Sequence, residues 1–510
     1  MATPTSTSSF LNIGFPLFSS LLVLCLLSSK KAQASDGIEG SEILKSQHPQ
    51  LHTHLVRLSS LVLSKTSVCQ HPSNIYSKGT KGGASLRLVH GHGPCSSHHS
   101  NTASPTLAQT LTQDQHRVNS IQSRLSHHNH TSQIPFDPSL AATADIPAQS
   151  GISFDTFNYL VTVSIGTPKR DLSLAFDTGS DLTWTQCQPC SPPGSCYNQI
   201  QPIFNPSASK SYSAVPCASK LCISLMWAGK SPGCRNSTCV YAIEYGDKSY
   251  TIGFFGKERL ELTQSDVVKS FVFGCGLKNK GLFGRVAGLL GLGRGKISIV
   301  SQTARKYGKV FSYCLPSSPR FTGHLTFGKS KHGSSLSNGS SSSVQFTPFV
   351  KEMKHPSFYF LQLTAIGVGG RKIPVGASVS ALKGMIIDSG TVITRLPPAT
   401  YRALRSAFQR QMAGYPRAEG FELLDTCYDF RGYEEVRVPK ISMFFSGDVE
   451  VEIDSSGILI SDDVERACLA FAGNSAATDI AIIGNFQQKT LDVVYDLAGG
   501  RLGFSAHGCK

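Results

Sequence analysis

Two stretches of the sequence place an aspartate directly after an apolar run. Residues 174–184 read LAFDTGSDLTW and residues 385–396 read MIIDSGTVITRL, so Asp177 and Asp388 each follow residues that suit a buried strand. A carboxylate that points into a protein core costs several kcal/mol unless it is paired or hydrogen-bonded. Each acid therefore needs a partner, and the repeated context makes each aspartate the candidate partner of the other.

A pair of carboxylates a few Å apart supports acid–base chemistry. Both cannot ionise together, so the pair holds one proton, with one apparent pKa lowered and the other raised. The ionised acid can take a proton from a water molecule as that water attacks a peptide carbonyl, while the protonated acid supports the developing oxyanion. This chemistry requires neither a metal ion nor an organic cofactor.

The residues beside each aspartate suit its support. Gly179 and Gly390 allow a close backbone approach that a Cβ atom would block. Hydroxyl groups flank both glycines and can hydrogen-bond the carboxylates, which offsets the cost of burial. These hydroxyls belong to Thr178, Ser180, Ser389 and Thr391. One such motif is weak evidence, because Asp and Gly are common turn residues, but two in matching contexts are far more specific.

The elements around the two motifs also repeat along the chain. Residues 158–165 (NYLVTVSI) and 359–363 (YFLQL) predict a strand ahead of each motif. An apolar-apolar-Gly segment follows each motif, as GLLG at 288–291 and AIIG at 481–484. Such a repeat indicates two halves related by duplication, with the two acids facing each other across a pseudo-twofold axis.

Composition favours a β-rich protein of two or three compact units. The 510 residues include 47 Gly and 26 Pro, and short β-branched and aromatic runs lie between turn signals. Further strands are expected at 241–245 and 271–273, and short helices at 299–307 and 402–412. The Ser/Gly-rich residues 330–343 mark a natural boundary between the two halves.

Charge and motif content exclude several other classes of protein. The net charge of +15 is spread thinly, without five consecutive Lys or Arg residues, which favours an ordinary solvated surface over a nucleic-acid stripe. The sequence contains neither a Gly-x-Ser-x-Gly elbow nor a His-Glu-x-x-His motif. Serine, cysteine and metal hydrolysis are therefore poorly supported.

The first 34 residues predict a secretory signal peptide. An apolar run at 17–27 is too short to span a bilayer and precedes Ala-Gln-Ala at 32–34, and no later stretch is long and apolar enough to span a membrane. Asn236 and Asn338 lie in glycosylation tripeptides consistent with secretion. No Lys or Arg precedes the apolar run, as a typical secretory signal would have. The opening residues are rich in Ser and Thr and contain no acids, as in plastid transit peptides, so a chloroplast location is the alternative.

Residues 35–140 differ in character from the rest of the chain. They are rich in Ser, His, Gln and Thr, and they contain twelve of the 16 histidines. We interpret them as a removable pro-segment that inhibits its own mature domain. Its histidines would gain charge as the pH falls toward and below ~6.5, which would weaken its hold on a basic mature domain.

The cysteines that follow residue 140 form an even set, which predicts disulfides made in an oxidising compartment. They are Cys187, Cys190, Cys196, Cys217, Cys222, Cys234, Cys239, Cys275, Cys314, Cys427, Cys468 and Cys509. Cys69 and Cys95 precede the expected folded region. Cys187 and Cys190 could instead form a redox or zinc half-site, but no second Cys-x-x-Cys follows at a zinc-ribbon distance, so no metal is expected.

The sequence resembles the pepsin-type aspartic proteases, and more closely their plant nepenthesin-like branch. The resemblance covers about 158–509, with a pro-segment match at 86–96 (LRLVHGHGPCS). It rests on both Asp motifs, Trp184, the Tyr-Gly-Asp at 245–247 and the two apolar-apolar-Gly segments. It implies an all-β, bilobal pepsin-like fold with pseudo-twofold related lobes and an interlobe cleft, and a proton shared between the acids is a known property of that family.

The resemblance also implies roles for single residues. Asp177 and Asp388 would be the catalytic pair, and Thr178 and Ser389 would hold their two loops together. The flap over the substrate would involve Tyr245, Gly246 and Trp184. The alternative for Tyr245 is a strand tyrosine with a half-buried ring.

The stretch 187–239 resembles the Cys-rich insertion that marks the nepenthesin-like branch. It would lie in an N-terminal lobe at 141–340, followed by a C-terminal lobe at 341–510. The family pattern would pair Cys187 with Cys190, Cys196 with Cys275, Cys217 with Cys239, Cys222 with Cys234, Cys314 with Cys509, and Cys427 with Cys468. Sequence alone could not choose these pairings.

By resemblance, the chain is expected to be a monomeric endopeptidase that cleaves polypeptides at acidic pH, made as a zymogen and secreted to the apoplast. Some members of the fold are recognition proteins that have lost a catalytic motif, but both motifs are intact here. Plant relatives also include a chloroplast nucleoid protease described as DNA-binding. DNA binding therefore stays open, without a basic motif to support it.

Overall fold

The computed structural model describes most of the chain after residue 51. The described residues are 52–62, 68–70, 79–80, 83–96, 106–126, 159–227, 232–245, 249–281, 283–328, 343–351, 355, 357–375, 384–461, 463 and 465–509. All of them belong to the second of two compact units, Pro49–Lys510. The expected signal segment, Gly246 and Asn338 lie outside the described residues. Within these ranges, no helix is long and apolar enough to cross a membrane.

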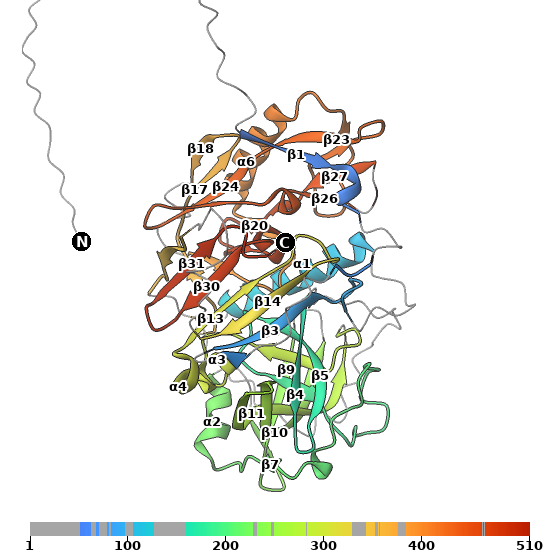
Figure 1. Ribbon diagram of the computed structural model, residues 1–510, viewed down its shortest axis with the longest axis vertical. Helices are drawn as coiled ribbons and strands as arrows, with labels where there is room; N and C mark the ends of the chain where they lie inside the picture. Colours follow the sequence, from blue (N-terminus) through green and yellow to red (C-terminus); the bar gives the residue numbers. More distant parts are fainter. Residues whose placement is uncertain are drawn as a thin grey trace, which may run out of the picture. The chain divides into compact units, whose positions relative to one another are not determined.

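Strands dominate the described unit, and most of them join one sheet of 16 strands (Figure 1). Its main path runs through β15 (Gln345–Pro348), β31 (Arg501–Ser505), β30 (Asp492–Asp496), β13 (Val310–Cys314), β14 (Thr322–Phe327), β3 (Gly83–His90), β4 (Tyr159–Ile165), β5 (Arg170–Asp177), β12 (Gly288–Gly291), β6 (Trp184–Gln186), β11 (Asp266–Lys280), β10 (Tyr250–Thr263), β9 (Thr238–Glu244) and β8 (Gly233–Arg235). Two short strands, β2 (Gly79–Thr80) and β7 (Ser213–Ala214), pair beside this path. The predicted all-β class is confirmed.

The second half of the chain also builds three smaller sheets. The first contains β16 (Phe360–Leu361), β19 (Met385–Ile387), β29 (Ala481–Ile483), β20 (Thr394–Leu396) and β28 (Phe471–Gly473). The second contains β18 (Arg371–Pro374), β17 (Leu363–Val368), β24 (Ile441–Phe445) and β25 (Val449–Glu452). The third contains β21 (Arg417–Ala418), β22 (Cys427–Asp429), β27 (Arg466–Leu469) and β26 (Leu459–Ile460).

Few helices accompany these strands. They are α1 (Leu107–Ser126), α2 (Lys220–Trp227), α3 (Ile299–Gln302), α4 (Ala304–Tyr307) and α6 (Pro398–Gln411). The helix expected at 299–307 is present but is divided at Thr303, and the helix expected at 402–412 begins four residues earlier, at Pro398. Helix α1 was not expected from the sequence.

The repeated motif contexts produce the same strand arrangement twice. In the first half, β12 runs parallel to β5 and antiparallel to β6, with Gly291 opposite Asp177. In the second half, β29 runs parallel to β19 and antiparallel to β20, with Ile483 opposite Ile387. Each apolar-apolar-Gly segment therefore lies beside the strand that leads into an aspartate. This matching topology supports the duplication inferred from the sequence.

The segment before residue 140 contributes strands to the folded unit. Strand β3 lies between β14 and β4, and Leu86 and Leu88 of β3 are fully buried. Strand β1 (Thr53–Arg57) pairs with β23 (Glu435–Pro439). The placement of Cys69 and Cys95 ahead of the folded region was therefore wrong: they form a disulfide, and Cys95 is buried. The alternating GASLRLVH pattern of β3 is the physical reason, because it buries one face of the strand.

The disulfides confirm two of the implied pairings and contradict four. Cys314–Cys509 and Cys427–Cys468 are as expected. The other pairs are Cys187–Cys275, Cys190–Cys196, Cys217–Cys234 and Cys222–Cys239.

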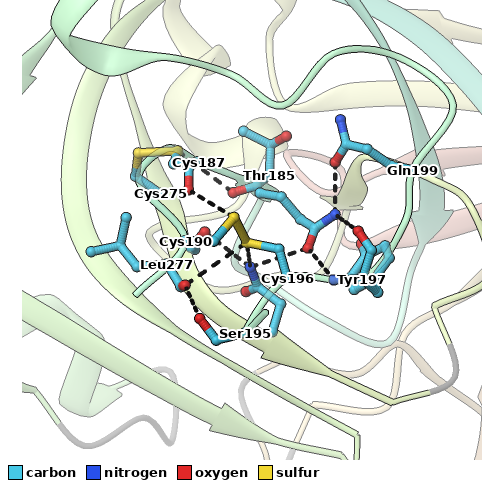
Figure 2. The surroundings of a disulfide bond; sticks show 12 residues. Thr185, Cys187, Cys190, Ser195, Cys196, Tyr197, Gln199, Cys275 and Leu277 are labelled. Carbon is cyan, nitrogen blue, oxygen red and sulfur yellow. Dashed lines mark hydrogen bonds between the residues drawn. A yellow bond between two sulfur atoms is a disulfide. The ribbon is translucent and has the colours of Figure 1, made fainter. Parts of the chain in front are cut away.

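Strand register explains the first two corrections (Figure 2). Strands β6 and β11 run parallel, with Thr185 beside Cys275, so Cys187 emerges next to Cys275. Cys190 and Cys196 then close the short loop between them, and Ser195 Oγ donates a hydrogen bond to the Leu277 carbonyl at 3.1 Å.

The other two corrections follow from a helix packing on a hairpin. Cys234 and Cys239 lie opposite each other in the β8–β9 hairpin. Cys222 of α2 and Cys239 belong to the same buried apolar cluster, so they pair, and Cys234 pairs with Cys217 at the hairpin's outer side.

Digestion of the oxidised protein without reductant tests this connectivity. Mass spectrometry of the peptides is expected to find Cys187 linked to Cys275 and Cys222 linked to Cys239, because the strand registers bring these sulfur atoms together. A reduced and alkylated sample is the control for peptide assignment. Peptides that link Cys187 to Cys190 would contradict the structure.

Candidate active site

The two aspartates of the repeated motif are buried, and backbone amides support both. Asp177 is 1% exposed and Asp388 is 0% exposed. The Gly179 amide donates to Asp177 Oδ1 at 2.9 Å, and the Gly390 amide donates to Asp388 Oδ1 at 3.3 Å. The Thr391 hydroxyl donates to Asp388 Oδ2 at 2.6 Å. These donors satisfy carboxylate oxygens that have left water, as the sequence led us to expect.

Direct hydrogen bonds join the two loops that hold the acids. The Ser389 amide donates to Thr178 Oγ1 at 2.9 Å, and the Thr178 amide donates to Ser389 Oγ at 3.1 Å. Both residues are buried. The expected contact of Thr178 with Ser389 is therefore present, and it fixes the two halves of the site against each other.

A guanidinium from helix α1 lies between the two aspartates. Arg117 Nη2 is 2.7 Å from Asp177 Oδ1 and 2.8 Å from Asp388 Oδ1. Arg117 Nε also donates to Asp388 Oδ2 at 2.9 Å, which makes that pair bidentate. One side chain therefore reaches both carboxylates, so the fold brings the two predicted acids together at a single point.

Burial and charge act in opposite directions at this cluster. Burial alone would raise the pKa of Asp388, but the charge and hydrogen bonds of Arg117, together with the Thr391 and Gly390 donors, outweigh it and lower the pKa. Burial would lower the pKa of Arg117, and the two carboxylates reverse this and raise it. The contact between Arg117 and Asp388 therefore favours the charged form of both side chains.

Arg117 was not predicted from the sequence, because residues 35–140 were interpreted from their histidine content alone. Helix α1 carries apolar residues that follow one another at spacings of four, seven, three and four residues: Leu107, Leu111, Val118, Ile121 and Leu125. Apolar residues at this spacing lie on one face of a helix and predict an amphipathic segment. Arg117 and Asp114 interrupt that apolar face, which was the available signal for a polar group aimed into the core.

The predicted flap residues contact each other. Trp184 Nε1 donates to the Tyr245 hydroxyl at 2.9 Å, and Trp184 is fully buried. The ring of Phe283 packs edge-on against both, with centroids 4.9 Å from Trp184 and 5.6 Å from Tyr245. Tyr245 follows directly after β9, so a strand on one side and an indole on the other set its position.

Among the four hydroxyls of the two motifs, the one from Thr391 donates to a carboxylate, whereas those of Thr178 and Ser389 bond across the two loops. Ser180 Oγ is buried and has no hydrogen-bond partner among the described residues, so its expected role in supporting Asp177 is not supported. The neighbouring Asp181, which sequence reasoning did not single out, is 3% exposed and accepts from the Gly295 amide at 2.8 Å and from Ser357 Oγ at 2.5 Å. Asp181 thereby ties the first motif to two other loops.

The described side chains offer a pair of acids without metal ligands around them. No group of three or more His, Cys, Asp or Glu side chains in the described ranges could hold a metal ion. Two buried carboxylates that face one point can share a proton and polarise a water molecule there once the guanidinium is absent.

Comparisons with known proteins agree with this geometry. The family models described as "Xylanase inhibitor N-terminal" and "Xylanase inhibitor C-terminal" match residues 159–329 and 358–506. An aspartyl protease family protein of Arabidopsis thaliana is 49% identical over 91% of this chain and 94% of its own length. Aspartic proteinase nepenthesin-1 of Nepenthes gracilis is 36% identical over 69% of this chain and 78% of its own length. The chain belongs to the plant nepenthesin-like aspartic proteases.

Two solved structures share the fold of this nepenthesin-like protease. Basic 7S globulin from soybean matches with a TM-score of 0.54 at 21% identity, over 68% of this chain and 92% of that one. The structure titled "Crystal structure of edgp" matches with a TM-score of 0.55 at 21% identity, over 68% of this chain and 91% of that one. At this identity the match shows the bilobal all-β fold alone.

The family-model descriptions name inhibitors, but this nepenthesin-like protease groups with peptidases. Aspartyl protease AED1 of Arabidopsis thaliana is 47% identical over 90% of this chain and 93% of its own length. Both Asp-Ser/Thr-Gly motifs are intact, and their acids meet at Arg117. The chain is therefore an aspartic-type peptidase.

Replacing Ser389 tests the hydrogen bonds between the two loops. Ser389→Ala removes the acceptor for the buried Thr178 amide, and an unsatisfied buried donor costs about 1–3 kcal/mol, so the urea midpoint of the full chain is expected to fall accordingly. Ser389→Thr keeps the hydroxyl, and Ser207→Ala changes an exposed serine whose backbone amide makes its contact. A Ser389→Ala protein as stable as Ser207→Ala would contradict this role.

Proposed function

We propose that this protein is an endopeptidase that hydrolyses polypeptides at acidic pH with a water molecule activated between Asp177 and Asp388, and that it is made as a secreted zymogen. The observation that carries the proposal is that one guanidinium contacts both carboxylates, at 2.7 and 2.8 Å. A water molecule is smaller than a guanidinium, so it can occupy the same point once Arg117 leaves.

The proposed reaction needs only the two acids and their supports. With Arg117 absent, two adjacent buried carboxylates share one proton. The ionised acid takes a proton from the water as its oxygen attacks the peptide carbonyl, and the protonated acid gives its proton to the developing oxyanion. Collapse of the tetrahedral intermediate breaks the C–N bond. The leaving amine takes a proton from the acid that accepted it from the water, and a hydroxyl of the intermediate returns a proton to the other acid, which restores the pair. The Thr391 hydroxyl and the Gly179 and Gly390 amides hold the carboxylates in place throughout.

Tyr245 and its neighbours are proposed to close over the substrate. The bond from Trp184 Nε1 to the Tyr245 hydroxyl ties the end of β9 to the strand that follows the Asp177 motif. The tyrosine is thereby positioned relative to the catalytic loop, which is what a flap residue requires. Gly246 continues this flap in the proposal.

Helix α1 is proposed to be the inhibitory part of the pro-segment. Arg117 forms ion pairs with both acids and would occupy the position of the reactive water. Leu111 packs with Val392 and Ile393, while Val118 and Ile121 pack with phenylalanines of the second half. The helix therefore covers apolar surface as well as charge, and no substrate can reach the acids while it stays.

Acid is proposed to release this helix. Because the folded-state pKa of Asp388 lies below its usual value of 3.8, its ion pair with Arg117 adds stability that is lost as the pH falls through that lowered pKa. Burial lowers the pKa of His90, on strand β3 of the pro-segment, from 6.5 to about 3. The unfolded segment binds a proton there first, so the precursor loses stability as the pH falls from about 6.5 toward about 3.

The disulfides support an oxidising compartment, and we propose secretion to the apoplast with chloroplast import as the alternative.

The proposed limits of the segments are a signal at 1–34, a pro-segment at 35–140 and lobes at 141–340 and 341–510. Asn236 sits at positive φ in the exposed β8–β9 turn, which suits a glycan. The active unit is proposed to be a monomer, because one chain supplies both acids.

Single substitutions of the acids test the catalytic assignment. In acid-treated protein, Asp177→Asn or Asp388→Asn is expected to lower kcat/KM on a denatured protein substrate by about 10³-fold or more, since an amide cannot exchange the reacting proton. Asp171→Asn, an exposed acid of the same lobe, is the matched control. Near-normal, pepstatin-sensitive cleavage by either active-site variant would refute the assignment.

Substitution of Arg117 tests the proposed inhibition. The full-length Arg117→Gln precursor is expected to cleave substrate and itself near neutral pH, where the wild-type precursor stays latent, because the acids are no longer paired. Arg87→Gln removes an exposed charge from β3 and serves as the control. Cleavage is followed by gel electrophoresis and N-terminal sequencing across pH. A variant as latent as the wild type at every pH would mean that Arg117 does not inhibit.

A further inference from the structure

A second carboxylate of helix α1 lies in a site built for it. Asp114 is 1% exposed and accepts hydrogen bonds from the Val392 amide at 2.6 Å and the Ile393 amide at 3.1 Å. Its Oδ2 is also 2.8 Å from Arg395 Nη2. We call these three donors, the amides of Val392 and Ile393 and the guanidinium of Arg395, the Asp114 site.

Arg395 is an unusual cation because it is almost completely buried, at 1% exposure. Its Nη1 donates to the Ile393 carbonyl at 3.0 Å, and its Nε has no hydrogen-bond partner among the described residues. Within the described residues, Asp114 is the carboxylate that forms an ion pair with it. The guanidinium thus depends on the pro-segment for the neutralisation of its charge.

The Asp114 site lies next to the proposed catalytic centre. Asp114 precedes Arg117 by three residues on α1, so their side chains lie on one face of the helix, about 4.5 Å apart along its axis. On the other side, Val392 directly follows Thr391, whose hydroxyl binds Asp388. A chain that occupies the place of α1 therefore passes the Asp114 site within a few residues of the scissile bond.

Removal of α1 would leave this site with an excess positive charge. Two amide donors and a guanidinium would lose their acceptor, and a buried charge or donor without a partner is costly. Val392 and Ile393 also pack in the apolar cluster that buries Leu111, which limits access of water to the amides. The Asp114 carboxylate satisfies all three donors at once, and a carboxylate of a substrate could do the same.

We propose that the Asp114 site is a substrate subsite that binds the carboxylate of an Asp or Glu side chain, so that the enzyme prefers polypeptides with an acidic residue at one fixed position near the cleaved bond. This inference rests on the proposed proteolytic function and on the release of α1. The apolar residues that contact Leu111, Val118 and Ile121 would receive apolar neighbours of that acid. Asp114 and its flanking apolar residues thus mimic the substrate.

The first test uses the wild-type full-length chain after acid activation. A library of peptides from a denatured proteome is digested at about pH 5, where Asp and Glu side chains are largely ionised, and the new ends are sequenced by mass spectrometry. We expect Asp and Glu to be enriched at one position relative to the cut. Two synthetic peptides that differ only by Glu or Gln at that position are then compared, and the kcat/KM ratio is expected to be on the order of 10- to 100-fold in favour of Glu, as for a charge-assisted hydrogen bond.

The second test assigns this preference to the guanidinium. Arg395→Gln is expected to bring the Glu/Gln ratio close to one, whereas Arg405→Gln, which removes a half-buried Arg that pairs with Asp425 outside the site, keeps it. Arg395→Lys, which keeps a charge but not the planar fork, is expected to keep part of the ratio. If Arg395→Gln does not fold, the wild-type comparison of the two peptides decides alone.

The outcomes separate this inference from the proposed function. Efficient, pepstatin-sensitive cleavage without any acidic preference would overturn the subsite and leave the protease assignment standing. A preference that persists unchanged in a folded Arg395→Gln enzyme would also overturn it, because another site would then bind the acid. Absence of cleavage at every pH would overturn the proposed function, and the subsite with it.

Discussion

The structure depends on the confinement of two buried carboxylates to one small space. Asp177 and Asp388 come from strands about 200 residues apart, yet both contact the same guanidinium. Two carboxylates that contact the same group are close enough to repel each other when both are charged. The fold must therefore supply a cation or a shared proton, together with donors that fix each acid. The bonds between Thr178 and Ser389 provide the rigid link, and the matching strand arrangements place both loops at the same depth.

The same constraint bears on residues 35–140, the proposed pro-segment. Helix α1 brings charges of both signs to this region: Arg117 contacts the acid pair, and Asp114 contacts the buried Arg395. Strand β3 fills a position between β14 and β4, which would otherwise present unpaired strand edges. Both elements are therefore part of the folded core, and ion pairs join α1 to the two aspartates and to Arg395. The proposed release by acid therefore depends on these ion pairs and on the buried His90, whose lowered pKa makes the fold less stable in acid. Repulsion among the other histidines is not required.

Local patterns predicted the parts of the fold that local physics controls. The alternation in residues 158–165 corresponds to β4, and the apolar runs before the two aspartates correspond to β5 and β19. The two apolar-apolar-Gly segments correspond to β12 and β29, whose pairing with β5 and β19 only the structure shows. The acid pair itself was predicted because an acid at the end of an apolar strand is costly without a partner. Pairings between cysteines failed, since strand register and the packing of α2 on the β8–β9 hairpin decide which sulfur atoms meet.

By itself, the sequence determined the family, the all-β class, the two acids and the loop residues that support most of their oxygens. These features follow from short segments whose chemistry is complete within about ten residues. Only the tertiary structure decided that Arg117 contacts both acids and that Asp114 pairs with Arg395. It also decided that Asp181 joins three loops and that Ser180 supports no carboxylate among the described residues. Each of these depends on groups from distant segments, and their distance in space is set by how the whole chain packs.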